Sequence, residues 1–151
     1  MIPYPVTGTM APVTTPRHVF ERAHAFVRTF DLRYADCFAE DGVLILPFAP
    51  PSMPRRTQGR AAIRALLEPR YRAGRASGRH IEYAGVTIHD TTDPEVIVVE
   101  FEAIGKEADG AIVYQLPFIL VIRVRDGEIV EQRDYFDSLA LESRLRVPDS
   151  A

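Results

Sequence analysis

The hydrophobic pattern of this chain changes its period about halfway along. Before residue 70, apolar residues recur mostly at spacings of three and four, as in helices that pack through one face. The later segments are rich in Val, Ile, Phe and Tyr and are separated by Asp-Pro or Asp-Gly pairs, which is typical of hairpin-connected strands; they span residues 80–90, 95–106, 111–125 and 128–137. Helices followed by such strands predict a segregated α+β domain, with a curved, mostly antiparallel sheet around the helices.

Three helices are expected before this run of strands. Thr15 and Pro16 suit the cap and the first position of the first helix. Its apolar face contains Val19, Ala23, Phe26, Val27 and Phe30. Asp31 can cap a second, short helix, and Gly59 precedes a third. Pro69 should kink or end the third helix, because proline cannot donate a hydrogen bond to the preceding turn.

Two segments have apolar side chains on both faces of a predicted strand. Residues 43–48 form a continuous apolar run that is too short for a helix. The strand across residues 112–124 has apolar residues at both odd- and even-numbered positions, so both of its faces need cover from solvent. The helices can cover one face of this strand. The other face would be apolar and uncovered, as in the interface of an obligate dimer, which resembles a core cut in half. We therefore expect a homodimer that forms through the outer face of the sheet.

Composition favours a single domain without a polyanionic partner. The chain has 46% hydrophobic and 26% charged residues, which is enough for one core. Its net charge of −3 argues against nucleic acid, and no window approaches the roughly 20 apolar residues of a membrane span. Cys37 is the only cysteine, which excludes an internal disulfide and suits a cytoplasmic location. We expect a flexible arm over residues 1–14, one domain over residues 15–147 and a tail over residues 148–151.

Several motifs resemble a known superfamily. FAEDG before the first strand, QGRAAIRALL in the third helix, DGEIVEQRDYFD in the last hairpin and the spacing between them resemble nuclear transport factor two-like proteins. This resemblance covers residues 16–145 and implies a cone-shaped, cystatin-like fold. RDYFD is also similar to the last-strand motif of limonene-epoxide hydrolases, and TDPEVIVVEFEAIGK to the phenazine-biosynthesis A/B proteins. Both groups, like SnoaL-like polyketide cyclases, have an acid in the cavity, and the resemblance assigns that role to Asp134.

The resemblance to the epoxide hydrolases does not extend to the groups that hold their water. In those enzymes, an Arg and an Asp stand two residues apart on the strand that corresponds to residues 95–106. This chain has Glu100 and Glu102 at those places. They also have a Tyr and an Asn on the first strand, where this chain has Leu44 and Leu46. An epoxide hydrolase with an altered site is therefore only a second alternative.

Three acids and one tyrosine are the candidate catalytic residues. Glu100 and Glu102 share one face of their strand, because side chains alternate with a period of two. If that face borders the cavity, the glutamates gather there with Asp134, and repulsion raises the pKa of one acid so that it can donate a proton. If that face is exposed, both are ordinary solvated carboxylates. Tyr114 could donate a hydrogen bond to an oxyanion. The expected apolar lining consists of Leu46, Phe48, Phe118 and Phe136.

These residues favour an enzyme that isomerises, cyclises or dehydrates a small, mostly apolar natural product. The alternative is a non-catalytic module that binds a small ligand or dimerises. The four histidines have no metal-site spacing and no glycine-rich phosphate loop occurs, so we expect no metal and no cofactor. The arginines from Arg55 to Arg79 are expected to form a solvated helix face, or else a clamp for a substrate carboxylate at the pocket mouth.

Overall fold

The computed structural model describes residues 14–145, in which four helices and one six-stranded sheet form an α+β fold. The predicted tail over residues 148–151, and all of the predicted arm except Thr14, lie outside the described residues. The helices are α1 (Pro16–Arg28), α2 (Arg33–Asp36), α3 (Arg60–Ala76) and α4 (Ser138–Leu145). The strands are β1 (Phe38–Ile45), β2 (Arg56–Gln58), β3 (His80–Asp90), β4 (Val96–Lys106), β5 (Ile112–Arg125) and β6 (Glu128–Phe136).

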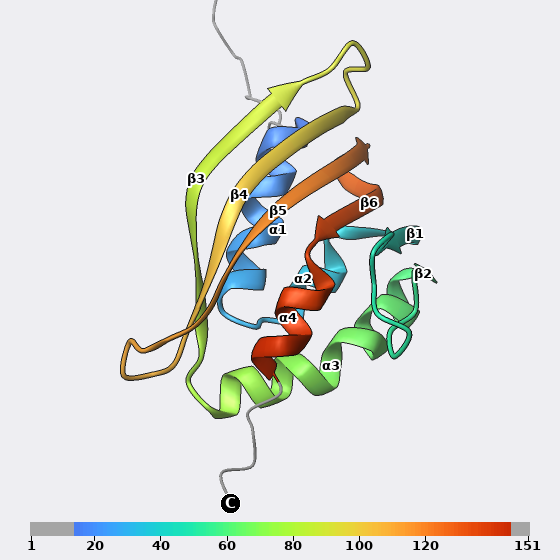
Figure 1. The fold of residues 1–151 in the computed structure, drawn as a ribbon. Coiled ribbons are helices and arrows are strands. Elements are labelled where there is room, and N and C mark those ends of the chain that lie inside the picture. The colour runs from blue at the N-terminus through green and yellow to red at the C-terminus, as the bar shows by residue number, and fades with distance from the viewer. Residues whose placement is uncertain (1–13, 146–151) are drawn as a thin grey trace, which may run out of the picture.

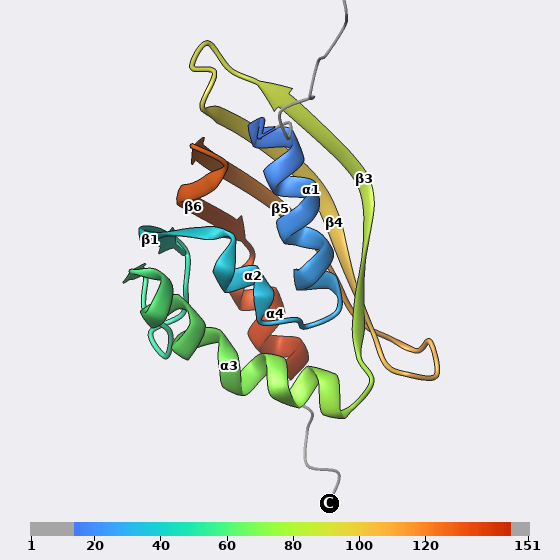
Figure 2. The same ribbon diagram turned by 180° about the vertical axis from the view of Figure 1, so that it is seen from behind.

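The sheet has the strand order β2-β1-β6-β5-β4-β3. All neighbours are antiparallel except β1 and β6, which run parallel. The long strands β3, β4 and β5 curve around α1, and α3 lies across one end of the fold with α4 beside it (Figures 1 and 2). The predicted α+β class with a curved, mostly antiparallel sheet is therefore confirmed.

The turns between the long strands explain why their bounds could be predicted closely. At the β5–β6 hairpin, Asp126 and Gly127 have φ values of 51° and 75°. Asp-Gly is the sequence that best tolerates two successive positive φ values in a tight hairpin. Each of the four long strands begins and ends within one residue of its predicted position.

The first helix begins as predicted, and the third continues beyond its predicted end. The Thr15 side chain accepts a hydrogen bond from His18 N at 3.3 Å. The expectation that Pro69 ends α3 is wrong, since the helix runs on to Ala76. Packing holds the last two turns, because Phe30 fills the space beside Gly74, where a Cβ would come within 2.6 Å of its ring.

The first strand begins earlier than predicted. β1 begins at Phe38, before the predicted apolar run over residues 43–48, and it ends at Ile45. The register of β1 against β6 shifts between Phe38 and Val43, so residues 40–42 form a bulge within this longer strand. Gly42 permits this bulge, since a Cβ there would lie 2.8 Å from the Ile129 carbonyl oxygen.

Candidate functional site

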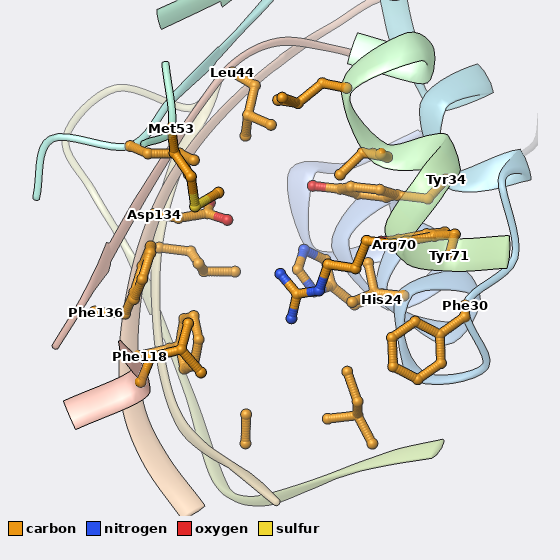
Figure 3. Close-up of a pocket in the computed structure, with 18 of the residues that line it drawn as sticks. His24, Phe30, Tyr34, Leu44, Met53, Arg70, Tyr71, Phe118, Asp134 and Phe136 are labelled. Atoms are coloured by element: carbon orange, nitrogen blue, oxygen red, sulfur yellow. The ribbon is translucent and has the colours of Figure 1, made fainter. Parts of the chain in front are cut away.

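The concave face of the sheet and the surrounding helices enclose a cavity of about 300 Å³. Its lining is mostly apolar, with a few polar side chains that point inward (Figure 3). Those polar residues are His24, Tyr34, Ser52, Arg70, Tyr71, Tyr83, Tyr114 and Asp134. A mostly apolar cavity of this size with few convergent polar groups is typical of a small-molecule site.

Four aromatic rings form a continuous wall along the sheet side of the cavity. One ring comes from each of β3, β4, β5 and β6: they belong to Tyr83, Phe101, Phe118 and Phe136. Neighbouring ring centroids are 4.0, 5.6 and 5.3 Å apart, with interplanar angles of 23°, 2° and 22°. A wall of nearly parallel rings offers a planar ligand an extended surface for aromatic contact.

Asp134 and Tyr34 are held by the same side-chain amide. Nε2 of Gln132 donates to Oδ1 of Asp134 at 2.8 Å and to the hydroxyl oxygen of Tyr34 at 2.9 Å. Both residues line the cavity, and Figure 3 shows the Tyr34 hydroxyl and the Asp134 carboxyl directed into it.

The environment of Asp134 gives it the pKa of a useful acid/base group. Burial raises the pKa of its carboxyl from 3.8 to about 6, and the hydrogen bond from Gln132 opposes part of this rise. Burial also raises the pKa of Tyr34 well above 10, and the nearby Asp134 carboxylate adds to that effect. Near neutral pH, Asp134 can therefore accept a proton and return it, while Tyr34 keeps its hydroxyl proton.

His24 is the buried neighbour of this pair. Its Nδ1 lies 2.8 Å from the Tyr83 hydroxyl. Burial lowers the pKa of His24 from 6.5 to about 3, an effect that Gln132 partly offsets. Among the described residues, His24 Nε2 and Gln132 Oε1 are the buried side-chain atoms without a hydrogen-bond partner. His24 is thus neutral at physiological pH, and it belongs to the polar cluster around Gln132 rather than to a cationic site.

Arg70 on α3 and Tyr114 on β5 contribute further polar groups to the cavity. Arg70 follows Leu66 by four residues on α3 and therefore shares its inward side. Burial raises the pKa of Tyr114, and the adjacent Arg70 guanidinium partly offsets this. The Tyr114 ring lies over Gly105, where a Cβ would come within 2.6 Å of its Cζ atom. Gly105 therefore makes the space that Tyr114 occupies.

Most of the residues predicted for the site line this cavity. Asp134, Tyr114, Leu46, Phe118 and Phe136 are among the lining residues. Phe48 is not a lining residue: it is 60% exposed, and its ring packs against that of Tyr135.

The prediction that Glu100 and Glu102 gather with Asp134 is wrong. Both glutamates point to the outer face of the sheet, where Glu100 lies 2.7 Å from His89 Nε2 and its side chain is 53% exposed. Glu102 accepts a hydrogen bond from Gln115 Nε2 at 2.5 Å on the same face. The apolar neighbours, such as Phe101, face the cavity instead, because burying two unpaired carboxylates would cost far more.

Tyr34, His24 and Gln132 line or support the site but were not predicted from the sequence. Gln132 is two residues before Asp134 on β6, so the strand period places both side chains on one face. His24 follows Phe20 by four residues on α1 and shares its buried side. The sequence shows that Gln132 shares a face with Asp134 and that His24 shares a face with Phe20. It does not show the hydrogen bonds of these residues to Tyr34 and Tyr83, which come from distant elements.

The comparison with known families agrees with this geometry. Residues 20–132 match the SnoaL-like domain. The chain belongs to the SnoaL-like domain family. The predicted superfamily and its SnoaL-like group are thereby confirmed.

Proteins similar to this SnoaL-like domain are found in Pseudomonas aeruginosa and Bacillus subtilis. An uncharacterised PhzA/B-like protein of Pseudomonas aeruginosa is 31% identical over 108 residues, which span 70% of this chain and 72% of that protein. YesE of Bacillus subtilis, also uncharacterised, is 28% identical over 131 residues, spanning 82% and 86% of the two chains. The crystal structure of a suspected isomerase from Bacillus subtilis superposes with a TM-score of 0.69 at 25% identity, covering 85% of this chain and 91% of that one.

Two further features bear on possible ligands and location. Within residues 14–145, no group of three or more His, Cys, Asp and Glu side chains is placed to hold a metal ion. The helices of this region are all too short or too polar to cross a bilayer.

Proposed function

We propose that this SnoaL-like domain is a cofactor-independent enzyme that moves a proton on a small, mostly apolar ring compound, with Asp134 as its acid/base. The observation that carries this proposal is the position of Asp134. A carboxyl with a pKa of about 6 stands in an apolar cavity, beside a tyrosine hydroxyl held by the same amide. A general base is most effective when its pKa lies near the working pH.

The first step would be removal of a proton from a carbon next to a carbonyl group. The Asp134 carboxylate takes this proton, the C–H electron pair becomes the new C=C bond, and the π pair of the C=O bond moves onto the carbonyl oxygen. Tyr34 then donates its hydroxyl hydrogen bond to the enolate oxygen, because the Tyr34 oxygen accepts from Gln132 and its own proton has no acceptor among the described residues. Donors fixed before the reaction stabilise the developing charge without reorganisation.

The second step would return the proton from Asp134. Where the substrate has a C=C bond conjugated with the enolate, delivery to the far carbon of that bond shifts the double bond and gives an isomer. Delivery to a β-hydroxyl group releases water and gives a dehydrated product. The enolate carbon could instead attack a second carbonyl of the same molecule, whose oxygen takes the proton, and this closes a ring. The predicted isomerisation, dehydration and cyclisation therefore share one initial step.

Epoxide hydrolysis is less well supported. It requires several polar groups around an attacking water, and the residues that face the cavity here are Leu44 of β1 and Leu46 just after it. Glu100 and Glu102 of β4, which stand where the epoxide hydrolases have their Arg and Asp, lie on the outer face of the sheet.

A proton-exchange assay tests the proposal without the natural substrate. The probe is 2-tetralone, a two-ring ketone with acidic C–H bonds, incubated with the protein in D₂O and followed by ¹H NMR. We expect the protein to accelerate loss of the α-proton signals, and Asp134→Asn to reduce this acceleration by about 10²-fold. Glu102→Gln is the matched control, because it makes the same chemical change on the outer face.

Two results would contradict the proposal. One is equal exchange by the wild-type protein and Asp134→Asn. The other is an Asp134 carboxyl that titrates near 4 in ¹³C NMR, which would remove the physical basis for general acid/base catalysis and favour the non-catalytic binding module.

A further inference from the structure

Among the described residues, Arg70 and Arg75 are the two arginines of α3 that form no salt bridge, and of these only Arg70 lines the cavity. Arg60, Arg64 and Arg72 of the same helix pair with Glu128, Asp36 and Glu68 at distances of 2.7, 2.6 and 2.9 Å. Arg79, just beyond the helix, pairs with Glu107 at 2.7 Å. Arg70 forms no salt bridge with any residue among positions 14–145.

The position of Arg70 on α3 directs its charge into the cavity. Leu66, Leu67 and Tyr71 line the cavity with it, at the spacings expected for one side of a helix. Figure 3 shows the Arg70 guanidinium reaching from the helix side into the space opposite Phe118 and Phe136. The side of α3 that lines the cavity therefore carries one cation, Arg70. An arginine that served only to keep the surface soluble would lie on the opposite side of the helix.

Arg70 is also the one cationic side chain among the described lining residues. His24 is neutral there, since burial holds its pKa at about 3. Asp134 is the one carboxyl in the same lining, and it forms no ion pair with Arg70. The cavity thus has an acid/base group and a separate, unpaired cation, with the wall of four rings along one side.

We propose that the ligand of this cavity is a planar ring carboxylate, whose carboxylate binds Arg70 while its ring lies against the wall formed by Tyr83, Phe101, Phe118 and Phe136. A guanidinium can donate two parallel hydrogen bonds to a carboxylate, which fixes orientation as well as charge. The inference rests on the proposed function, because it assigns a substrate class to the same cavity. It gives Arg70 a binding role that is distinct from the proton transfer at Asp134.

The test compares two probes of nearly equal shape, 2-naphthoate and its neutral counterpart 2-naphthamide, by isothermal titration calorimetry at pH 8. We expect the wild-type protein to bind 2-naphthoate about tenfold more tightly than the amide, and added salt to weaken only the naphthoate. Arg70→Met, which keeps an unbranched stem and removes the charge, should abolish this preference. Arg70→Lys should retain part of it.

Arg72→Met is the matched control, since it removes the same charge from the same helix. This variant should keep the preference for 2-naphthoate, and a thermal melt of each variant checks that it is folded. The inference is overturned if wild-type protein does not bind 2-naphthoate, if it binds both probes equally, or if Arg72→Met loses as much preference as Arg70→Met.

The two proposals can fail separately. Asp134→Asn should lose proton exchange and keep its preference for the carboxylate probe. A protein that exchanges protons through Asp134 but does not discriminate between the probes would refute the ligand class and leave the proposed chemistry standing. A protein that prefers the carboxylate but shows no exchange would do the reverse.

Discussion

Gln132 donates a 2.8 Å hydrogen bond to Asp134, two residues along the same face of β6. The Gln132 side chain is completely buried, so its amide cannot be replaced by water without opening the core. Its second hydrogen bond goes to Tyr34 on α2, which connects the sheet to the helices. Gln132 therefore sets both the position and the acidity of the proposed catalytic acid.

Replacing Gln132 by Leu should raise the pKa of Asp134 above its present value of about 6. The hydrogen bond from Gln132 favours the charged carboxylate, so its loss leaves burial unopposed. The pH profile of proton exchange should shift to higher pH, and ¹³C titration of Asp134 should shift with it. Gln115→Leu removes the corresponding amide beside Glu102 on the outer face and should leave the profile unchanged. An Asp134 titration that is the same in the wild type and Gln132→Leu would refute this role.

Replacing Asp134 by Asn should stabilise the protein above pH 6 and change its stability little below pH 4. Because the folded pKa is raised, the folded state binds more protons than the unfolded state between pH 3.8 and about 6, and stability from this group falls as pH rises through that window. A shift of this size corresponds to at most about 3 kcal/mol. Asn keeps an oxygen for the Gln132 hydrogen bond and cannot ionise.

Urea unfolding at pH 4 and pH 7.5 measures this effect. His24 acts in the opposite direction, because its lowered pKa makes stability rise with pH between about 3 and 6.5. Asp134→Asn should therefore show a steeper rise in stability from pH 4 to pH 7.5 than the wild type, whereas Glu100→Gln should not. Equal effects of Asp134→Asn at both pH values would contradict the raised pKa.

The strands that could be predicted closely are those whose sequence signals are local. Period-two alternation and the Asp-Gly turns are local, and they fixed β3 to β6 closely. The start of β1 was missed because its bulge depends on pairing with β6, which is far along the chain. Nothing in the local pattern of residues 38–42 indicates that a parallel partner will be available there.

The candidate site shows the same limit at the level of single strands. In β4, carboxylates alternate with apolar residues, so alternation alone places Phe101 inside and Glu102 outside. The predictions left both orientations of this face open, because inward glutamates would gather with Asp134 in the cavity. In β6, polar residues occur at both parities, so the orientation of Asp134 was set by its family position and Gln132 was overlooked. The salt-bridge partners that distinguish Arg70 from Arg72 depend on tertiary contacts and have no sequence signature.

Replacing Gly105 by Ala should displace Tyr114 from the cavity wall. The two residues are opposite one another in the register of β4 and β5, and an added Cβ would lie 2.6 Å from Cζ of Tyr114. Overpacking of this kind costs about 1–3 kcal/mol. A double-mutant cycle with Tyr114→Ala measures the clash: removal of the ring should cost less in the Gly105→Ala background than in the wild type. Additive costs within about 0.5 kcal/mol would show that the ring and Cβ do not meet.

Replacing Ile119 by Arg should dissociate the predicted homodimer. Ile119 is 43% exposed at the centre of the outer sheet face, where Tyr135 is its register partner on β6. Val121 and Pro117, two residues to either side, extend this apolar surface along β5, and exposed apolar area of this kind is typical of an interface. An arginine there would bury an unpaired charge on association, which is strongly unfavourable, whereas in a monomer it would meet only water.

Size-exclusion chromatography with light scattering should give a dimer for the wild type and a monomer for Ile119→Arg. Ile112→Arg is the control, because Ile112 is 59% exposed at the far end of the same strand, and this variant should remain dimeric. A wild-type protein that is monomeric at micromolar concentration, or a dimer that survives Ile119→Arg, would show that the outer face has another role.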